Sequence, residues 1–295
     1  MALVALLRAQ PQNTTWRELT EQVRESGSAL HVWEHYFHTR LTPDGDHERM
    51  LSDAATDLRS WAASGLRFVS VLDALFPRRL LDVVETPPFL ITQGQVDPVD
   101  EGVSVIGSRA ASERGRAIAA MIATHLVETG LTVISGLSSG IDTAAHTAAL
   151  AAGGRTVAFI GTGSLNFFPP ENRDLQRRIA SEGAVLSQFW PQASFSKTSF
   201  PMRNAVMSGY GLATIVVEAS EHSGARIQAR KAVEHGRPVV LTDRVVAATS
   251  WARSLARCPG VWVASGLRDV SDIIADLRRQ PKAIEQALYA LAQDR

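Results

Sequence analysis

Residues 103–112 read VSVIGSRAAS, a short run of β-branched and apolar residues that stops at a Gly-Ser turn. The same arrangement returns in TVISGLSSGIDTAAHTAAL, residues 132–150. A buried parallel strand is typically a continuous Val/Ile-rich run, and a Gly/Ser turn that opens a helix leaves backbone N–H groups free at the end of the strand. Each stretch therefore predicts a strand, an anion-binding turn and a helix.

Two later stretches repeat the pattern: TVAFIGTGSLNFFPPEN, residues 156–172, and ATIVVEASEHSGARIQARKAVEHGRPVVL, residues 213–241. Strands that alternate with helices from residue 103 to about residue 264 indicate an α/β fold with a doubly wound, mainly parallel sheet. In such a sheet the turns converge on one edge. We therefore expect one shared site with a phosphate-bearing ligand.

Composition narrows the class of protein. The 295 residues are 45% hydrophobic and carry no net charge, so the chain is globular, and nucleic-acid binding would need a local basic patch. The lone Cys258 excludes a disulfide framework and a cysteine zinc site. The opening MALVALLRAQ lacks a basic signal-peptide region, and no apolar run approaches the ~20 residues of a membrane span. We expect a cytoplasmic protein that does not contact membranes.

The chain divides into three predicted parts. Residues 1–63 form a small N-terminal helical region, in which Thr15 and Glu18 match a capping box. A turn is predicted at Pro43-Asp44-Gly45, and a second helix over residues 52–63. Residues 64–280 form the main domain, which begins with extended segments at residues 67–71 and 89–91. Residues 281–295 form a tail helix whose apolar stripe either docks on this domain or contacts a second subunit.

The first turn offers a phosphate site. Gly107 permits close approach of the backbone to an anion, Ser108 offers a hydroxyl, and Arg109 offers a planar fork of donors. A plain strand-to-helix turn with a solvated arginine explains the same residues. Ser112 is suited to cap the helix that follows.

The second turn contains Ser135-Gly136 and Gly140, followed by Asp142 and His146 four residues apart on one helix face. Such a pair could orient a general base. The alternative is a helix-capping aspartate with a hydrogen-bonded, partly buried histidine. Because no nucleophile accompanies the pair, we favour the structural alternative and expect no catalytic residue.

The third turn holds Gly161, Gly163 and two adjacent aromatics, Phe167 and Phe168. They could stack a nucleobase, although one of them is expected to anchor the loop. Farther along the chain, Lys197 and Arg203 could join Arg109 in a groove that follows phosphates. Glu218 ends the last of these strands, where an acidic residue can hold a ribose hydroxyl or a neighbouring arginine.

At this point the sequence resembles the DNA-processing protein A family of bacteria over most of its length. The resemblance rests on ordered motifs, namely Gly107-Ser108-Arg109, Ser135-Gly136-Leu137, Gly140-Ile141-Asp142, Ala145-His146, Phe168-Pro169, Glu171-Asn172, Phe200-Pro201, Arg203-Asn204, Val217-Glu218-Ala219 and Ser223-Gly224, with Gly65, Phe76-Pro77, Leu80, Pro87-Pro88, Leu90 and Gly94 upstream. It implies an extended Rossmann-like domain that binds single-stranded DNA in a basic pocket, self-associates and helps to load a RecA-type recombinase in transformation. It implies no catalytic activity, metal or cofactor.

The chain also departs from the family pattern. Family members commonly carry a long, often basic side chain where this chain has Ser139, Ser-Glu where it has Ser187-Gln188, and a further arginine where it has Ala205. The family's residues after the final strand are replaced by Thr242-Asp243 and by Trp251-Ala252-Arg253, and no C-terminal winged-helix domain is expected. Fewer cations weaken phosphate contacts. The resemblance is therefore to a divergent member, whose role could lie outside transformation.

We predict a non-enzymatic single-stranded-DNA-binding protein and recombination mediator in DNA uptake or processing, acting as a homodimer. A nucleotide sensor or nucleotide-cleaving enzyme that uses the same glycine-rich pocket, and a structural partner with an unused pocket, remain alternatives. The dimer surface is expected at residues 261–263, with Trp251 and Leu255 nearby. The candidate DNA- or phosphate-binding residues are Gly107, Ser108, Arg109, Ser135, Gly136, Gly140, Gly161, Gly163, Phe168, Asn172, Lys197, Arg203, Asn204, Glu218, Ser223 and Gly224.

Overall fold

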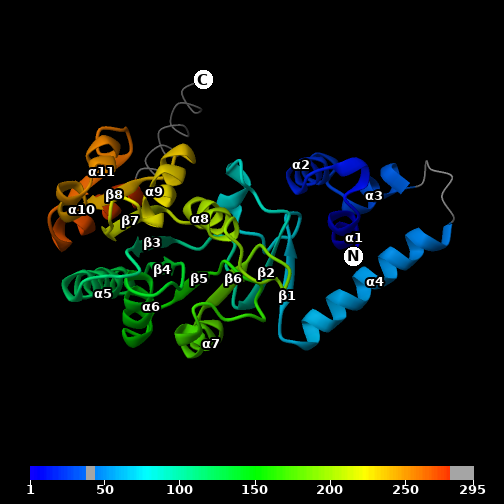
Figure 1. Cartoon of the computed structure of the whole chain (residues 1–295), viewed down its shortest axis with the longest axis horizontal. Coiled ribbons are helices and arrows are strands. Elements are labelled where there is room, and N and C mark those ends of the chain that lie inside the picture. The colour runs from blue at the N-terminus through cyan, green and yellow to red at the C-terminus, as the bar shows by residue number, and fades with distance from the viewer. Residues whose placement is uncertain (38–43, 280–295) are drawn as a thin grey trace, which may run out of the picture.

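A computed structural model of the chain describes residues 1–37 and 44–279. Its centre is a nine-stranded sheet in the order β1-β2-β6-β5-β4-β3-β7-β8-β9 (Figure 1). The strands are β1 (Arg67–Ser70), β2 (Phe89–Gly94), β3 (Gly102–Gly107), β4 (Thr132–Ser135), β5 (Thr156–Phe159), β6 (Ala184–Ser187), β7 (Ala213–Glu218), β8 (Val239–Thr242) and β9 (Val261–Ala264). The pairs from β6 through β9 are parallel, whereas β1–β2 and β2–β6 are antiparallel.

The sheet is wound in two directions from β3. The chain first adds β4, β5 and β6 on one side, and it then returns to add β7, β8 and β9 on the other. The order therefore reverses between β3 and β7, which pair in parallel with Val105 opposite Ile215. Ligands of open α/β sheets bind at such a reversal, outside the carboxyl ends of the strands. The predicted doubly wound, mainly parallel α/β sheet is confirmed.

Helices cover both faces of the sheet (Figure 1). Alternation along the strands creates the two faces: Val103 and Val105 of β3 enter one hydrophobic cluster, and Ile106 enters the other. The first cluster is covered by α5 (Glu113–Glu128), α6 (Ile141–Ala151) and a helix over residues 267–279, and the second by α8 (Ser199–Tyr210), α9 (Gly224–Glu234), α10 (Asp243–Ala248) and α11 (Ser250–Leu255). Helix α7 (Arg173–Glu182) packs against α6.

The N-terminal region is helical, as predicted. It contains α1 (Ala2–Ala9), a short 3-10 turn at Pro11–Asn13, α2 (Trp16–Ser26), α3 (Ala29–Phe37) and α4 (Asp44–Ala63). Two further 3-10 turns, Arg78–Asp82 and Pro170–Asn172, lie later in the chain. The capping box of Thr15 and Glu18 is present at the start of α2. The predicted turn at Asp44 and Gly45 is wrong, because both residues lie in α4, which begins eight residues before the predicted Ser52. The packing of α4 on α1 outweighs the weak helix propensity of glycine.

Aromatic rings join these helices to the sheet. Trp190, which follows β6, lies 4.6 Å from Phe89 of β2, 5.3 Å from Trp16 of α2 and 5.7 Å from Trp61 of α4, measured between ring centroids. The N-terminal helices thus share one hydrophobic core with the antiparallel strands. The boundary at residue 63 stays a prediction. The predicted tail helix over residues 281–295 lies outside the described residues, and no described helix has the length and apolar character needed to cross a membrane.

Candidate functional site

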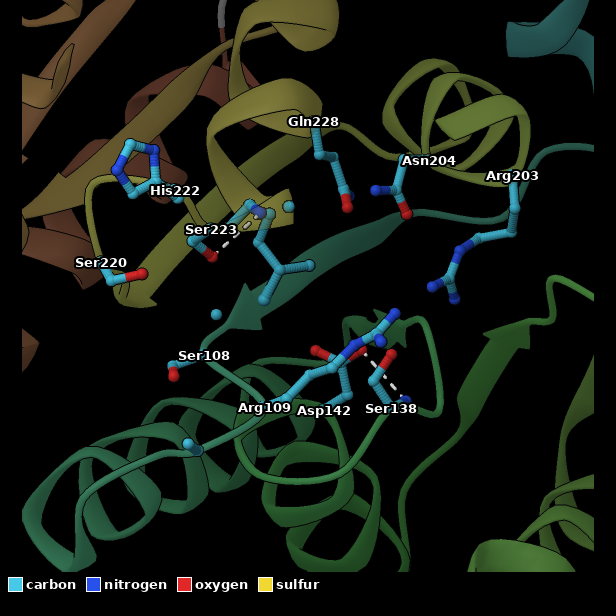
Figure 2. A pocket seen from close by; sticks show the side chains of 15 residues that line it. Ser108, Arg109, Ser138, Asp142, Arg203, Asn204, Ser220, His222, Ser223 and Gln228 are labelled. Carbon is cyan, nitrogen blue, oxygen red and sulfur yellow. Dashed lines mark hydrogen bonds between the residues drawn. The ribbon is translucent and has the colours of Figure 1, made fainter. Parts of the chain in front are cut away.

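A pocket of about 430 Å³ opens at the reversal between β3 and β7 (Figure 2). Its walls are the turn after β3, the turn after β7, the beginning of α6, and one turn of α8. The carboxyl ends of the strands and the amino end of α9 point toward this space, so the predicted convergence of the turns is realised at these two strands. The lining residues are Ile106, Gly107, Ser108, Arg109, Ala110, Ser138, Asp142, Arg203, Asn204, Ser220, His222, Ser223, Gly224, Ala225 and Gln228.

Backbone hydrogen bonds fix the turn after β3. The amide of Ser108 donates to the carbonyl of Glu218 at 2.7 Å, and the carbonyl of Ser108 accepts from the amide of Ile141 at 3.2 Å. Gly140 has φ +82°, and a Cβ there would lie 2.3 Å from the Ser108 carbonyl oxygen. Gly140 is therefore required for the two turns to lie against each other, and its role is structural.

Arg109 is the exposed cation of the pocket. Its guanidinium makes no hydrogen bond or ion pair within residues 1–37 and 44–279, and its Cζ lies 5.0 Å from the centroid of the Phe200 ring. Figure 2 shows this side chain passing over Asp142 toward Arg203. A guanidinium with uncommitted donors and a cation–π contact at its side is suited to bind phosphate.

Arg203 forms the floor of the pocket and is only 4% exposed. Its Nη1 donates to the carbonyl oxygen of Phe159 at 2.6 Å and to that of Gly136. A Cβ on Gly136 would lie 2.1 Å from the same nitrogen, so this glycine makes room for the guanidinium. The predicted phosphate-following groove is therefore corrected at this position: Arg203 lines the pocket, but its Nη1 is committed to the protein backbone.

Buried charges oppose one another beneath Arg109. Burial raises the pKa of Asp142. The charge of Arg203 and a hydrogen bond from the amide of Ser138 at 3.2 Å act in the opposite direction, but burial has the larger effect. Burial lowers the pKa of Arg203 to about 10, although the charge of Asp142 acts to raise it. Arg203 thus remains protonated at neutral pH, and the acidic group of Asp142 lies beside it in the floor of the pocket.

The wall opposite Arg109 carries amide groups. Gln228 of α9 is 2% exposed, and its Nε2 has no hydrogen-bond partner among the described residues. Figure 2 shows its side chain and that of Asn204 of α8 approaching each other across the pocket. Ser223 caps α9 by accepting from the amide of Ala225 at 3.2 Å. A buried amide donor without a partner costs free energy, and a ligand acceptor placed beside it would recover that cost.

Seven of the predicted site residues line this pocket, and the structure adds five further polar ones. The seven are Gly107, Ser108, Arg109, Arg203, Asn204, Ser223 and Gly224, and the five are Ser138, Asp142, Ser220, His222 and Gln228. Ser220 and His222 lie between the predicted residues Glu218 and Ser223 in the turn after β7. Because this turn is already expected at the shared edge of the sheet, the sequence could have indicated them as well. Gln228 lies inside a helix, where nothing in the local pattern indicated its direction.

Three predicted residues instead hold the fold together. The hydroxyl of Ser135 donates to the Val105 carbonyl at 2.7 Å, and the amide nitrogen of Asn172 donates to the Leu137 carbonyl at 2.9 Å. Glu218 accepts hydrogen bonds from Ser112, which caps α5. These groups are engaged within the protein, and no arginine of the described residues pairs with Glu218.

The remaining predicted residues belong to an aromatic group beside the pocket. Phe168 lies 4.5 Å from Phe195 and 5.5 Å from Phe200, measured between ring centroids. Lys197, which lies between Phe195 and Phe200 in the sequence, is exposed. Phe167 instead lies under two arginines of α7. Gly161 contacts the ring of Phe200, and the amide of Gly163 donates to the Ala193 carbonyl at 2.8 Å.

Asp142 and His146 are not joined by a hydrogen bond in the described structure. Nδ1 of His146 bonds the hydroxyl of Thr156 at 2.7 Å, and Asp142 accepts from the amide of Ser138 just before α6. His146 is fully buried rather than partly buried, and burial lowers its pKa to about 3. Within residues 1–37 and 44–279 no group of three or more His, Cys, Asp or Glu side chains is placed to hold a metal.

The chain is similar to known proteins of one family. The family described as DNA recombination-mediator protein A matches residues 67–276. A DNA processing protein of Streptococcus pneumoniae is 40% identical over 171 residues, which cover 58% of this chain and 60% of that protein. Protein Smf of Synechocystis is 36% identical over 178 residues, 59% of this chain and 45% of that protein. The chain therefore spans about half the length of these curated relatives.

Solved structures agree with this result. The crystal structure of DNA processing protein A from Streptococcus pneumoniae superposes with a TM-score of 0.73 at 28% identity, covering 92% of this chain and 97% of that one. DNA processing protein A of Helicobacter pylori, whose structure is described in terms of its single-stranded DNA binding mode, superposes with a TM-score of 0.64. At 19% identity the second match shows the shared fold alone.

Proposed function

Since the chain belongs to the DNA recombination-mediator protein A family, we propose that it binds single-stranded DNA at the β3–β7 pocket and mediates recombination in DNA uptake or processing. The observation that carries the proposal is the uncommitted guanidinium of Arg109 at the pocket mouth, above the buried guanidinium of Arg203. Two guanidiniums beside a helix amino end favour a phosphodiester ligand.

The aromatic group supports a single-stranded ligand over a duplex. Phe195 is 55% exposed, packs on Phe168 and has Lys197 as a near neighbour in sequence. Exposed rings next to cations bind the unpaired bases of a single strand, and each stacked base contributes ~1–3 kcal/mol. Bases within a duplex are already stacked and cannot reach such a ring. Lys197 and Phe168 keep their predicted role in this proposal.

The proposal includes no enzymatic step, metal or cofactor. The engagement of Glu218 with Ser112 supports this, because a carboxylate held by the residue that caps α5 is not placed to act on a ribose. The buried, neutral His146 likewise lies away from the pocket lining. A RecA-type recombinase and a second copy of this chain are the proposed partners, and the cytoplasm is the proposed compartment.

The size of the pocket favours one alternative. A volume of about 430 Å³ lies within the range of small-molecule sites, so a free nucleotide could fill it. Fluorescence anisotropy distinguishes the two ligands. We expect labelled oligo-dT to bind more tightly than the matching duplex, with an affinity that falls as salt rises, and mononucleotides to compete weakly. Tight mononucleotide binding together with weak oligo-dT binding would favour the nucleotide-ligand alternative.

A further inference from the structure

We propose that a DNA strand held in the β3–β7 pocket continues along the outer face of α9, where Arg226 and Arg230 bind its next phosphates. This inference rests on the proposed function and extends it from one pocket to a track. It assigns a role to two arginines that the pocket itself leaves unused, because neither contributes to the pocket lining.

The pocket continues onto α9. A second groove of about 430 Å³ shares His222 and Ser223 with the pocket and runs on past Arg226, Ile227 and Arg230. A third groove of about 430 Å³ lies on the other side of the same two arginines and reaches α11. Arg226 and Arg230 thus form a ridge between two hollows, and the first hollow is continuous with the pocket at the amino end of α9.

The charges on this ridge are uncommitted. Within the described residues neither Arg226 nor Arg230 forms a side-chain hydrogen bond or an ion pair. Lys231 on the same helix differs, because it pairs with Glu85 at 2.8 Å and with Glu234 at 2.7 Å.

The acids beside this ridge leave its arginines uncommitted. Among the described residues that line the two grooves these acids are Glu221 and Glu234, and Glu234 pairs with Lys231. The Glu221 carboxylate faces Arg226 but already accepts from the amide of Ser250 at 2.9 Å and from the hydroxyl of the same residue. Both carboxylates are therefore engaged with other groups, and Arg226 and Arg230 keep uncommitted positive charge suited to phosphates.

The spacing fits a polymer. Residues four apart on a helix face the same side and rise about 6 Å along the axis, comparable to the separation of successive phosphates on an extended strand. Ile227 beside them is 46% exposed and offers an apolar surface to a base or sugar. Ala225 and Gln228 of the same helix are buried, so α9 presents one face to the pocket and the other to the groove.

The test uses oligo-dT of two lengths. An oligonucleotide of about 2 nucleotides stays in the pocket, which has the volume of a small-molecule site, and one of about 16 reaches α9. The double variant Arg226→Ala/Arg230→Ala should bind the long oligonucleotide about tenfold more weakly at ~0.1 M salt, with a slope of log K against log salt reduced by about 1.4. The short oligonucleotide should bind within about twofold of wild type, because it does not reach the ridge.

A matched control removes the same charge elsewhere. Arg268→Ala/Arg279→Ala takes two exposed arginines from the helix over residues 267–279, on the opposite face of the sheet, and should leave both affinities unchanged. Equal loss with this control, unchanged binding of the long oligonucleotide by the α9 variant, or equal weakening at both lengths would overturn the track while the pocket proposal stands. Failure of the wild-type protein to bind either length would overturn the proposed function itself.

Discussion

The carboxylate of Glu218, at the end of β7, accepts a hydrogen bond at 2.8 Å from the amide of Ser112, and its second oxygen accepts from the hydroxyl of the same residue. Ser112 in turn caps α5 by accepting from the amide of Gly115 at 2.9 Å. These hydrogen bonds connect the end of β7 to the start of α5, the helix that follows β3. This contact removes Glu218 from the pocket and makes it a residue of the fold.

Glu218→Ala should therefore lower the free energy of unfolding by about 1–3 kcal/mol, because it leaves two donors of Ser112 without their partner. Glu218→Gln keeps one acceptor oxygen and should lose less. Chemical denaturation measures both effects. Oligo-dT affinity per folded molecule should stay near wild type, and a selective loss of binding without loss of stability would show that Glu218 contacts the ligand.

Arg109→Ala should weaken oligo-dT binding by roughly 1.5–3 kcal/mol, the range for a hydrogen bond to a charged group, with an unchanged melting temperature. Arg109→Lys should restore only part of the affinity, because a point charge cannot reproduce the planar fork. Arg114→Ala is the matched control, since Arg114 is exposed nearby on α5 but lines a different hollow. If both Arg109 variants bind like wild type, the guanidinium is a solvated surface group.

Gln228→Leu should stabilise the protein and weaken its binding. The buried Nε2 of Gln228 has no partner among the described residues, and an apolar side chain of similar size avoids that cost of about 1–3 kcal/mol. Thermal unfolding should show a higher midpoint, and anisotropy should show a lower affinity for oligo-dT. A destabilised variant with full affinity would mean that the amide supports the fold and does not meet a ligand.

His146 should make stability depend on pH. Burial lowers its folded pKa to about 3 from 6.5, so the unfolded chain binds more protons between these values. The contribution of His146 to the free energy of unfolding is therefore fully present above about pH 6.5. It is lost as the pH falls toward 3, by up to ~1.4 kcal/mol per pH unit.

The comparison of wild type with His146→Gln isolates this contribution from that of Asp142. Burial raises the pKa of Asp142, so acidification favours the folded state at that residue. Wild type should lose stability faster than His146→Gln between pH 6 and 4 in urea titrations, a window set by the folded and unfolded pKa values of His146. Parallel curves for the two proteins, or nucleotide hydrolysis that disappears in the variant, would contradict a purely structural histidine.

Self-association is expected through β9. This strand lies at one end of the described sheet, with Val263 44% exposed, as the predicted edge requires. The other predicted dimer residues need correction, because Trp251 and Leu255 are buried at 7% and 9% exposure and belong to the core. Val263→Lys should shift a dimer toward monomer in light scattering across a concentration series. A monomer mass for wild type at high concentration, with or without oligonucleotide, would exclude the dimer.

The sequence by itself determined the alternation of strands and helices from residue 103 onward and the edge at which the site forms. Periodicity and glycine-rich turns are local signals, and parallel strands necessarily bring their carboxyl ends together. For that reason Gly107, Ser108 and Arg109 could be placed with Ser223 and Gly224, although more than a hundred residues separate the two turns.

Tertiary structure alone decided which way the side chains point. Glu218 binds Ser112, Arg203 is buried on backbone carbonyls, and Gln228 faces the pocket from inside a helix. These directions depend on how a helix is rotated against its neighbours and on which polar groups lose water when distant segments pack together. Neither quantity is encoded in a local pattern, because each is set by contacts between residues far apart in the chain.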